Sequence, residues 1–277
     1  MKFKSTFIVI LTVVLVCSCK TSPFTGKKVL NFVSNDQLFP LAFQQYNQFL
    51  SQNNVVNGTT DSDMVKRVGQ KIAVAADRYL AARGFPGYTK DYKWEYNLVN
   101  DDLVNAWAMP GGKIVVYTGI LPITQTETGL AMVMGHELAH ALADHGAQRM
   151  SAGQLQQYGQ LGVAIGAGAS GQSQEQTAGW LQAYGIGSQL LGTLPFSRKH
   201  ETEADNIGVI LAAIAGYDPY EAPNLWRRMG AASNGQAPPE FLSTHPSSES
   251  RISNLTERAA EAVAEAKKFG VTSFKKG

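Results

Sequence analysis

Hydrophobic residues recur at helical spacing along most of the chain. Apolar side chains at i, i+3 and i+4 mark five segments, which are residues 36–51, 61–82, 197–215, 220–229 and 249–268. This period is typical of helices that bury one face. The second segment ends at a turn signal, Gly84-Phe85-Pro86-Gly87. We therefore expect a chain that is mostly helical.

A strand pattern is confined to the region before residue 119. Residues 93–100 alternate apolar with polar side chains, which predicts a half-buried strand. Residues 105–109 and 113–118 flank Pro110-Gly111-Gly112, which predicts a hairpin with a glycine turn. A few short strands ahead of a run of helices favour the α+β class with a small antiparallel sheet.

Residues 151–193 differ in composition from the rest, being rich in Gly, Gln and Ser. Four glycines lie close together, at Gly162, Gly166, Gly168 and Gly171. The favoured interpretation is a tight helix contact followed by a flexible connection. The alternative is a mobile flap over an active site. The glutamines that interrupt this segment argue against a membrane span.

The amino terminus has the features of an export signal. Lys2 and Lys4 precede an apolar stretch over residues 7–16, and Val16-Cys17-Ser18-Cys19 is similar to a bacterial lipobox. Cys19 is the better lipid acceptor because small Ser18 precedes it, whereas bulky Val16 precedes Cys17. We expect residues 1–18 to be a lipoprotein signal peptide, 19–35 a tether, and 36–277 the folded domain. An ordinary signal peptide or an uncleaved anchor is the alternative, and both also imply export.

The charge balance excludes one class of partner. The formal net charge is +2, and it falls to zero when Lys2 and Lys4 of the leader are left out. The sequence has no basic block and no interleaving of basic with aromatic residues. We therefore expect no nucleic-acid partner.

The strongest chemical signal is His136-Glu137-Leu138-Ala139-His140, in a predicted helix over residues 129–148. Thr124 and Glu127 have the spacing of a capping box at its start. Residues four apart lie on one helix face, so the two imidazoles can bind one metal ion. Glu137 is placed to reach a water on that ion. Two histidines and an adjacent base predict a zinc hydrolase.

A third zinc ligand is expected from the second half of the chain. Glu201 and Asp205 are four residues apart and therefore share a helix face. Glu201 is the predicted ligand, and Asp205 is predicted to accept the free N–H of a ligating histidine. Glu203 is less suitable because Ile207 stands where a second carboxylate would be needed.

With these motifs the chain resembles peptidase family M48, from about Asp61 to about Ile252. The segments that carry the resemblance are 105–112, Tyr117-Thr-Gly119, 136–140, Ser197-Arg198 with Glu201-x-x-Ala-Asp205, and Thr244-His-Pro246. The resemblance implies a mostly helical zincin-like domain and a gluzincin-type site. One Zn²⁺ would be bound by His136, His140 and Glu201, with Glu137 as general base.

The resemblance also implies how substrate is held and which branch of the family is nearest. A strand formed by Asn105, Ala106, Trp107, Ala108 and Met109 would pair with an extended substrate. Pairing through main chain implies broad specificity for unfolded segments. The exported lipoprotein branch is the most similar one, because there is no second hydrophobic segment. Only about 25 residues follow Ile252, so we expect no helical-repeat domain.

The remaining histidines need separate interpretation. His145 is predicted to make a structural hydrogen bond, and His200 to face away from the metal. His245 precedes Pro246 in a loop. It has two possible catalytic roles: to donate to the oxyanion of the transition state, or to occupy the open zinc position and hold the enzyme latent. A plain loop histidine is the remaining alternative.

The sequence therefore predicts a zinc-dependent metalloendopeptidase that cleaves unfolded or misassembled envelope proteins with a zinc-activated water. It is expected at the periplasmic face of the bacterial outer membrane, anchored through lipid on Cys19. The alternative is a proteolytically latent chaperone or assembly lipoprotein that uses the same groove. Glu137 disfavours this alternative, since a binding protein needs no base. An exopeptidase would need a charge that captures a chain end, and no residue suggests one.

Overall fold

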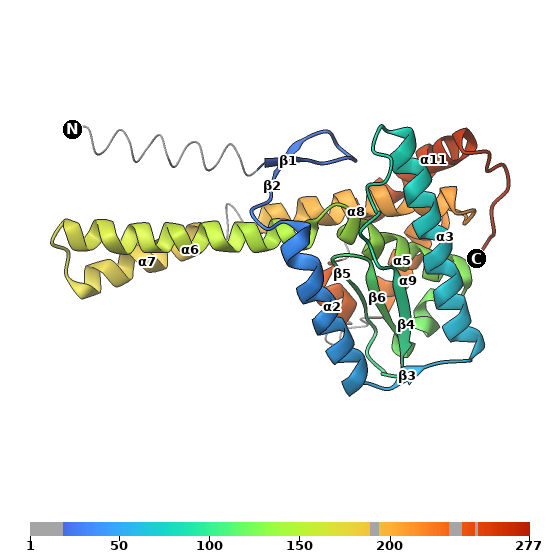
Figure 1. Cartoon of the computed structure of the whole chain (residues 1–277), viewed down its shortest axis with the longest axis horizontal. Coiled ribbons are helices and arrows are strands. Elements are labelled where there is room, and N and C mark those ends of the chain that lie inside the picture. The colour runs from blue at the N-terminus through green and yellow to red at the C-terminus, as the bar shows by residue number, and fades with distance from the viewer. Residues whose placement is uncertain (1–18, 189–193, 233–239, 247–248) are drawn as a thin grey trace. The chain divides into compact units, whose positions relative to one another are not determined.

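A computed structural model describes residues 19–188, 194–232, 240–246 and 249–277 (Figure 1). The predicted signal peptide, residues 1–18, lies outside the described residues. The chain divides into two compact units. We call residues 35–144 with 201–277 the core unit, and residues 19–34 with 145–200 the hairpin unit. Each unit is described by itself.

The core unit contains a four-stranded sheet with the order β3-β4-β6-β5. Its strands are β3 (Val55–Val56), β4 (Glu95–Val99), β5 (Ala106–Met109) and β6 (Lys113–Tyr117). The hairpin β5–β6 is antiparallel, as predicted, and β3 is antiparallel to β4. However, β4 and β6 are parallel, so the predicted antiparallel sheet is in fact mixed.

The strand order explains this difference. The second strand of the hairpin, β6, lies beside β4, and β5 therefore lies at the edge of the sheet. Every residue of β6 is buried, whereas most of β5 is only half-buried. A continuous apolar run such as Ile114-Val115-Val116 is typical of a central strand covered on both faces. Burial of β6 therefore accounts for its place in the middle.

Helices cover the sheet and confirm the predicted periodicity (Figure 1). Helix α2 (Asn35–Gln52) packs against the sheet through Tyr46, whose hydroxyl donates to the carbonyl of Ile114 at 3.0 Å. The other helices of this unit are α3 (Thr60–Ala82), α4 (Leu121–Thr124) after the 3-10 turn Thr118–Ile120, α9 (Glu221–Ala231), α10 (Glu240–Thr244) and α11 (Glu249–Lys268). Helix α8 (Leu194–Ile214) belongs to this unit from Glu201 onward.

Helix α5 (Glu127–Leu142) carries the histidine motif and differs from its prediction at both ends. Its N-cap is Thr126, whose hydroxyl accepts the N–H of Gly129, whereas Thr124 belongs to α4. The predicted capping box of Thr124 and Glu127 is therefore wrong. The helix stops at Leu142 because Asp144 adopts a left-handed conformation, with φ of 56°.

The end of α5 is stabilised by two tyrosines from the segment before β4. The hydroxyl of Tyr92 donates to the carbonyl of Ala141, and that of Tyr88 donates to the carbonyl of Leu142, both at 3.1 Å. Carbonyls at a helix end need such partners when they are buried. A contact between distant segments thus ends a helix that local periodicity extended to residue 148.

The hairpin unit consists of a short β-ribbon and two long helices. Strands β1 (Cys19–Thr21) and β2 (Lys28–Leu30) pair antiparallel, and the N–H of Phe32 donates to Ser151 on α6 at 2.9 Å. The segment predicted as a tether thus contains ordered strands, and its role as a tether stays a prediction. Helices α6 (His145–Ala169) and α7 (Gln174–Ser188) form an antiparallel helical hairpin.

A close helix contact in the Gly-rich segment is confirmed, but at a different glycine. A β-carbon on Gly159 would collide with the hydroxyl of Tyr184, whereas Gly162, Gly166 and Gly168 have open space around them. The alternative of a mobile flap stays a prediction. Among the helices described, none combines the length and apolarity needed to cross a membrane.

Candidate metal centre

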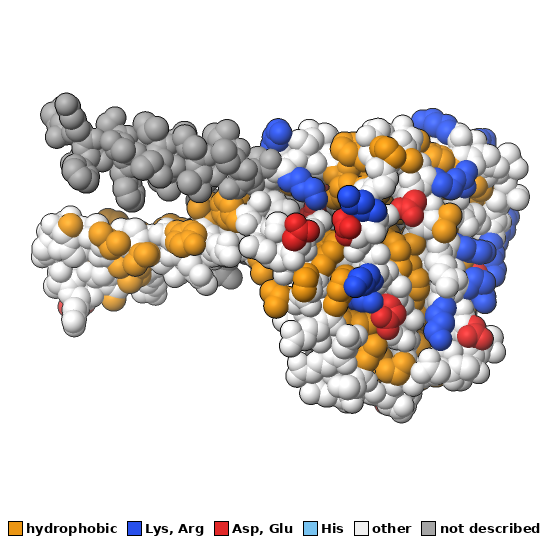
Figure 2. Space-filling model, in the orientation of Figure 1, with side chains coloured by type: hydrophobic (Ala, Val, Ile, Leu, Met, Phe, Trp, Pro, Cys, Tyr) orange, Lys and Arg blue, Asp and Glu red, His pale blue; other side chains and the backbone are white. Residues whose placement is uncertain are grey.

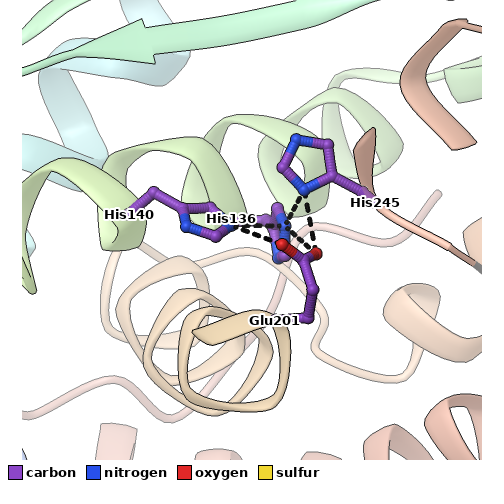
Figure 3. A group of neighbouring side chains, drawn as sticks. All are labelled: His136, His140, Glu201 and His245. Carbon is purple, nitrogen blue, oxygen red and sulfur yellow. Dashed lines mark hydrogen bonds and ion pairs between the residues drawn. The ribbon is translucent and has the colours of Figure 1, made fainter. Parts of the chain in front are cut away.

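Four side chains from three segments of the core unit converge on one point (Figure 3). The Nε2 atoms of His136 and His140 lie 3.0 Å apart on α5. Glu201 on α8 places its carboxylate oxygens 3.3 Å from Nε2 of His136 and 3.4 Å from Nε2 of His140. His245, which follows α10, places Nδ1 3.1 Å from Nε2 of His136 and 2.8 Å from Oε2 of Glu201.

These separations fit a tetrahedral metal ion. Zinc binds imidazole nitrogen and carboxylate oxygen at about 2.0–2.2 Å, so tetrahedral ligands lie roughly 3.3 Å from one another. The separations in the cluster range from 2.8 to 3.4 Å, and one donor atom from each of the four residues lies within 4.8 Å of every other. A set of imidazole nitrogens and one carboxylate suits zinc among the common divalent ions.

All four side chains are buried, with exposed fractions from 2% at His136 to 8% at Glu201 and His245. Burial opposes ionisation of Glu201, but hydrogen bonds with His136 and His245 prevail and hold the pKa of Glu201 far below its usual range. Burial likewise lowers the pKa of His136, but Asp205 and Glu201 outweigh it and raise that pKa to about 9. The carboxylates of Glu201 and Asp205 therefore stabilise positive charge in this site.

Asp205 takes the place that the sequence predicted for it. Its Oδ1 lies 2.9 Å from Nδ1 of His136, the ring nitrogen on the side away from the cluster. Arg251 on α11 in turn binds Asp205 at two points, with Nε 2.6 Å from Oδ2 and Nη2 2.8 Å from Oδ1. Such partners fix the orientation of a ligating histidine.

Sequence reasoning missed Arg251. Its guanidinium stacks on Trp226 at 3.4 Å from the ring centroid and lies 3.4 Å from Oε2 of Glu201. A signal was present in the sequence, because Arg251 continues the buried stripe of α11, which comprises Arg251, Leu255, Ala259, Ala262 and Ala266. A charged residue in line with an apolar stripe needs a buried partner.

Two glycines let the helices that carry the site approach each other. A β-carbon on Gly208 of α8 would lie 2.7 Å from the backbone N of His136, and one on Gly135 of α5 would lie 2.8 Å from the carbonyl oxygen of Gly208. Both positions are therefore restricted to glycine at this spacing. This contact brings Glu201 and Asp205 to the face of α5 that carries the histidines.

The predicted base and the predicted substrate strand lie near this cluster. Glu137 is 3% exposed, and its Oε1 lies 3.4 Å from Nε2 of His245. Strand β5 is in contact with α5 and pairs with β6 on one side. Asn105 precedes the strand, and its side chain accepts the N–H of Ala106 at 2.9 Å.

The other two histidines form a separate pair in the hairpin unit. His145 begins α6 rather than continuing α5, and its ring stacks on His200 at 4.1 Å between centroids. His200 also lies 3.2 Å from the side-chain oxygen of Gln148. Neither residue belongs to the four-residue cluster. The structural hydrogen bond expected of His145 stays a prediction.

The order of these motifs along the chain matches a known family. The family model described as "Peptidase family M48" matches residues 60–259, which covers all the site residues above. The chain belongs to peptidase family M48. Metal dependence is a property of this family of metallopeptidases, and the cluster on α5 and α8 is a candidate position for the metal.

Curated relatives of this M48 chain come from mitochondria and from bacteria. It is 40% identical over 187 residues to "Mitochondrial metalloendopeptidase OMA1" of Schizosaccharomyces pombe, covering 67% of this chain and 51% of that protein. It is 34% identical over 172 residues to "Beta-barrel assembly-enhancing protease" of Escherichia coli, covering 60% of this chain and 34% of that protein.

The human protein "Metalloendopeptidase OMA1, mitochondrial" is 29% identical over 262 residues, covering 88% of this chain and 46% of that protein. The M48 chain thus spans about half, or less, of the length of these relatives.

Proposed function

We propose that this chain is a zinc-dependent endopeptidase. The observation that carries the proposal is the convergence of His136, His140 and Glu201, with Glu137 beside them. These three residues would hold one Zn²⁺ per chain. A bound zinc supplies Lewis acidity, which polarises a peptide carbonyl and makes water acidic.

The residues of the chain supply the proton transfers. Glu137 accepts the proton of the attacking water and delivers it to the nitrogen of the leaving amine. The peptide C–N bond breaks as the new C–O bond forms, and the products are a carboxylate and an amine. Asp205 and Arg251 keep the ring of His136 oriented throughout, because both contact that ring.

Strand β5 is the proposed binding edge for an extended substrate. It lies at the edge of the sheet in contact with α5. In an antiparallel ladder alternate residues point their backbone groups away from the partner strand. Asn105 accepts from Tyr117 on the β6 side, so the residues that face the open edge are Ala106, whose N–H already binds the side chain of Asn105, and Ala108. Main-chain pairing at that edge favours unfolded segments of many sequences.

His245 sets the activity of the site in this proposal. Its Nδ1 takes the fourth donor position, which a water and the substrate carbonyl need. A chain in this arrangement is latent, and movement of His245 away from the cluster opens the site. The same arrangement supports the second candidate function, a chaperone or assembly lipoprotein that binds unfolded chains in the groove and does not cleave them.

The proposed substrates are unfolded or misassembled proteins of the bacterial envelope. The chain would act at the periplasmic face of the outer membrane, anchored through lipid on Cys19, with no nucleic-acid partner. The lipobox-like leader supports export. The similarity to a protein named for β-barrel assembly in Escherichia coli supports an envelope role.

The test uses Glu137→Gln, which keeps the shape of the side chain and removes the base. We expect casein cleavage by the zinc-loaded full chain to fall by about 100-fold or more, with zinc content unchanged. Glu203→Gln on α8 is the matched control and retains full activity. Unchanged cleavage by Glu137→Gln contradicts the role of the base. A wild type that binds unfolded casein but never cleaves it favours the chaperone.

A further inference from the structure

The two units of the chain carry opposite charge. The hairpin unit contains six basic residues and one acidic residue between Cys19 and Ser34 and between His145 and His200. The basic residues are Lys20, Lys27, Lys28, Arg149, Arg198 and Lys199. Its formal net charge is therefore +5. The core unit contains 16 basic and 21 acidic residues, a net charge of −5.

Within the hairpin unit the two helices that form the hairpin carry few charges, which are Arg149 near the start of α6 and Glu175 near the start of α7. Between Arg149 and Arg198 the chain has 48 residues, and Glu175 is the one charged residue among them. The polar positions are filled by uncharged residues, chiefly Gln, Ser and Thr. A helical hairpin in water normally carries charges on its outer face. The outer face of this hairpin instead carries few charges, so its transfer out of water costs little free energy.

Large apolar side chains are exposed on this hairpin. Tyr158 is 67% exposed, Ile165 64% and Trp180 61%, and Leu161 and Leu155 are exposed by 57% and 45%. In the view of Figure 2, orange hydrophobic side chains recur along the hairpin, where blue and red ones are nearly absent. Six of the eleven large hydrophobic residues that are exposed in the described parts of the chain belong to α6 and α7.

The exposed residues of α6 form one face. Tyr158, Leu161 and Ile165 are spaced i, i+3 and i+7, which places them on one side of the helix. The contact with α7 uses a different side, where Gln156 donates to Ser188 at 3.0 Å and Gly159 faces Tyr184. The apolar face is therefore left uncovered by the partner helix of the hairpin.

We propose that the α6–α7 hairpin docks on an anionic lipid bilayer. Leucine, isoleucine and aromatic side chains enter the boundary between headgroups and acyl chains, where tyrosine and tryptophan are favoured. The net charge of +5 on the same unit attracts it to the negative headgroups, each basic residue adding attraction near the surface. Cys19, the predicted lipid acceptor, lies on β1 of this unit, so both membrane contacts belong to one compact body. This inference is independent of the proposed peptidase activity.

A fluorescent probe at a single site tests the proposal. The full chain with Cys17→Ser, Cys19→Ser and Ile165→Cys is labelled with the polarity-sensitive dye NBD. The matched control places the label at Val74→Cys on α3, which is 58% exposed and apolar but belongs to the core unit. Both proteins are mixed with vesicles of phosphatidylethanolamine and phosphatidylglycerol. We expect a blue shift and a rise in emission at position 165 and no change at position 74.

A second pair of variants measures affinity. Leu161→Glu with Ile165→Glu is expected to reduce co-sedimentation with these vesicles by about tenfold or more, while Val74→Glu leaves it unchanged. Vesicles of phosphatidylcholine alone should bind the wild type less. Equal behaviour of the two labelled sites overturns the proposal. A blue shift at position 165 without vesicles also overturns it. If that shift depends on protein concentration, a second copy covers the face instead. If it does not, residues 1–18 cover the face.

Discussion

The guanidinium of Arg251 and the carboxylate of Asp205 form a two-point ion pair, with nitrogen–oxygen distances of 2.6 and 2.8 Å. Both residues are buried, and both contact the ring of His136. The pair links α11 to α8 and contacts His136, a candidate metal ligand on α5. A planar guanidinium can bind both carboxylate oxygens at once, which an ammonium group cannot do. The orientation of His136 therefore depends on arginine at position 251.

The first prediction concerns this pair. Arg251→Lys keeps the charge but removes one of the two hydrogen bonds, so His136 loses part of its support. We expect the zinc dissociation constant to rise by about 10- to 100-fold, the usual effect of losing a residue that orients a ligand. Competition with a fluorescent chelator measures it. Arg258→Lys, two turns along the same helix, is the control. Equal zinc affinity in both variants would show that Arg251 has no part in orienting the ligand.

The second prediction concerns the contact between α5 and α8. Gly208→Ala puts a methyl group 2.7 Å from the backbone of His136, so the helices must move apart. We expect a loss of about 1–3 kcal/mol in the free energy of unfolding and weaker zinc binding. Urea unfolding and metal analysis measure the two effects. Gly166→Ala on α6, which has open space around it, should be neutral or slightly stabilising. The idea fails if Gly208→Ala binds zinc as the wild type does.

The third prediction concerns His245. Because its Nδ1 fills the fourth donor position, His245→Ala should retain zinc through the other three residues and cleave casein several-fold faster. Thr244→Ala, at the preceding exposed position, should match the wild type. Slower cleavage with zinc retained would instead assign His245 to stabilising the oxyanion, and unchanged cleavage would make it a plain loop histidine.

The fourth prediction concerns pH and Glu127 at the start of α5. A hydrogen bond from Arg67 outweighs burial and, with Lys275 and Tyr217, lowers the pKa of Glu127 to about 2. A lowered pKa in the folded state means that the stabilisation is complete above the unfolded value of about 4.5 and is lost as pH falls toward 2.

We therefore expect Glu127→Gln to cost about 1–2 kcal/mol at pH 7, a value reduced for the half-exposed Arg67 and Lys275. The difference from the wild type should shrink between pH 4.5 and pH 2. Urea unfolding across this range measures it, with Glu257→Gln, an exposed residue of α11, as control. A difference that stays constant down to pH 2 would contradict the ion pairs as its cause.

The sequence by itself determined the local features of this protein. Helical periodicity located α2, α3, α8, α9 and α11, and a glycine turn between apolar runs located the β5–β6 hairpin. Residues four apart share one face of a helix, so helix geometry alone places His136 beside His140 and Glu201 beside Asp205. These predictions succeeded because each rests on residues close together in the chain.

Only the tertiary structure decided which of these features meet. It placed β6 rather than β5 beside β4, ended α5 at Leu142, and brought Arg251 and His245 to the histidines of α5. Residues more than a hundred positions apart meet only where packing permits. Here the contact between α5 and α8 depends on sterics, because Gly135 and Gly208 leave room for the two helix backbones to touch. No local spacing encodes that contact, which brings the candidate metal ligands of α5 and α8 together.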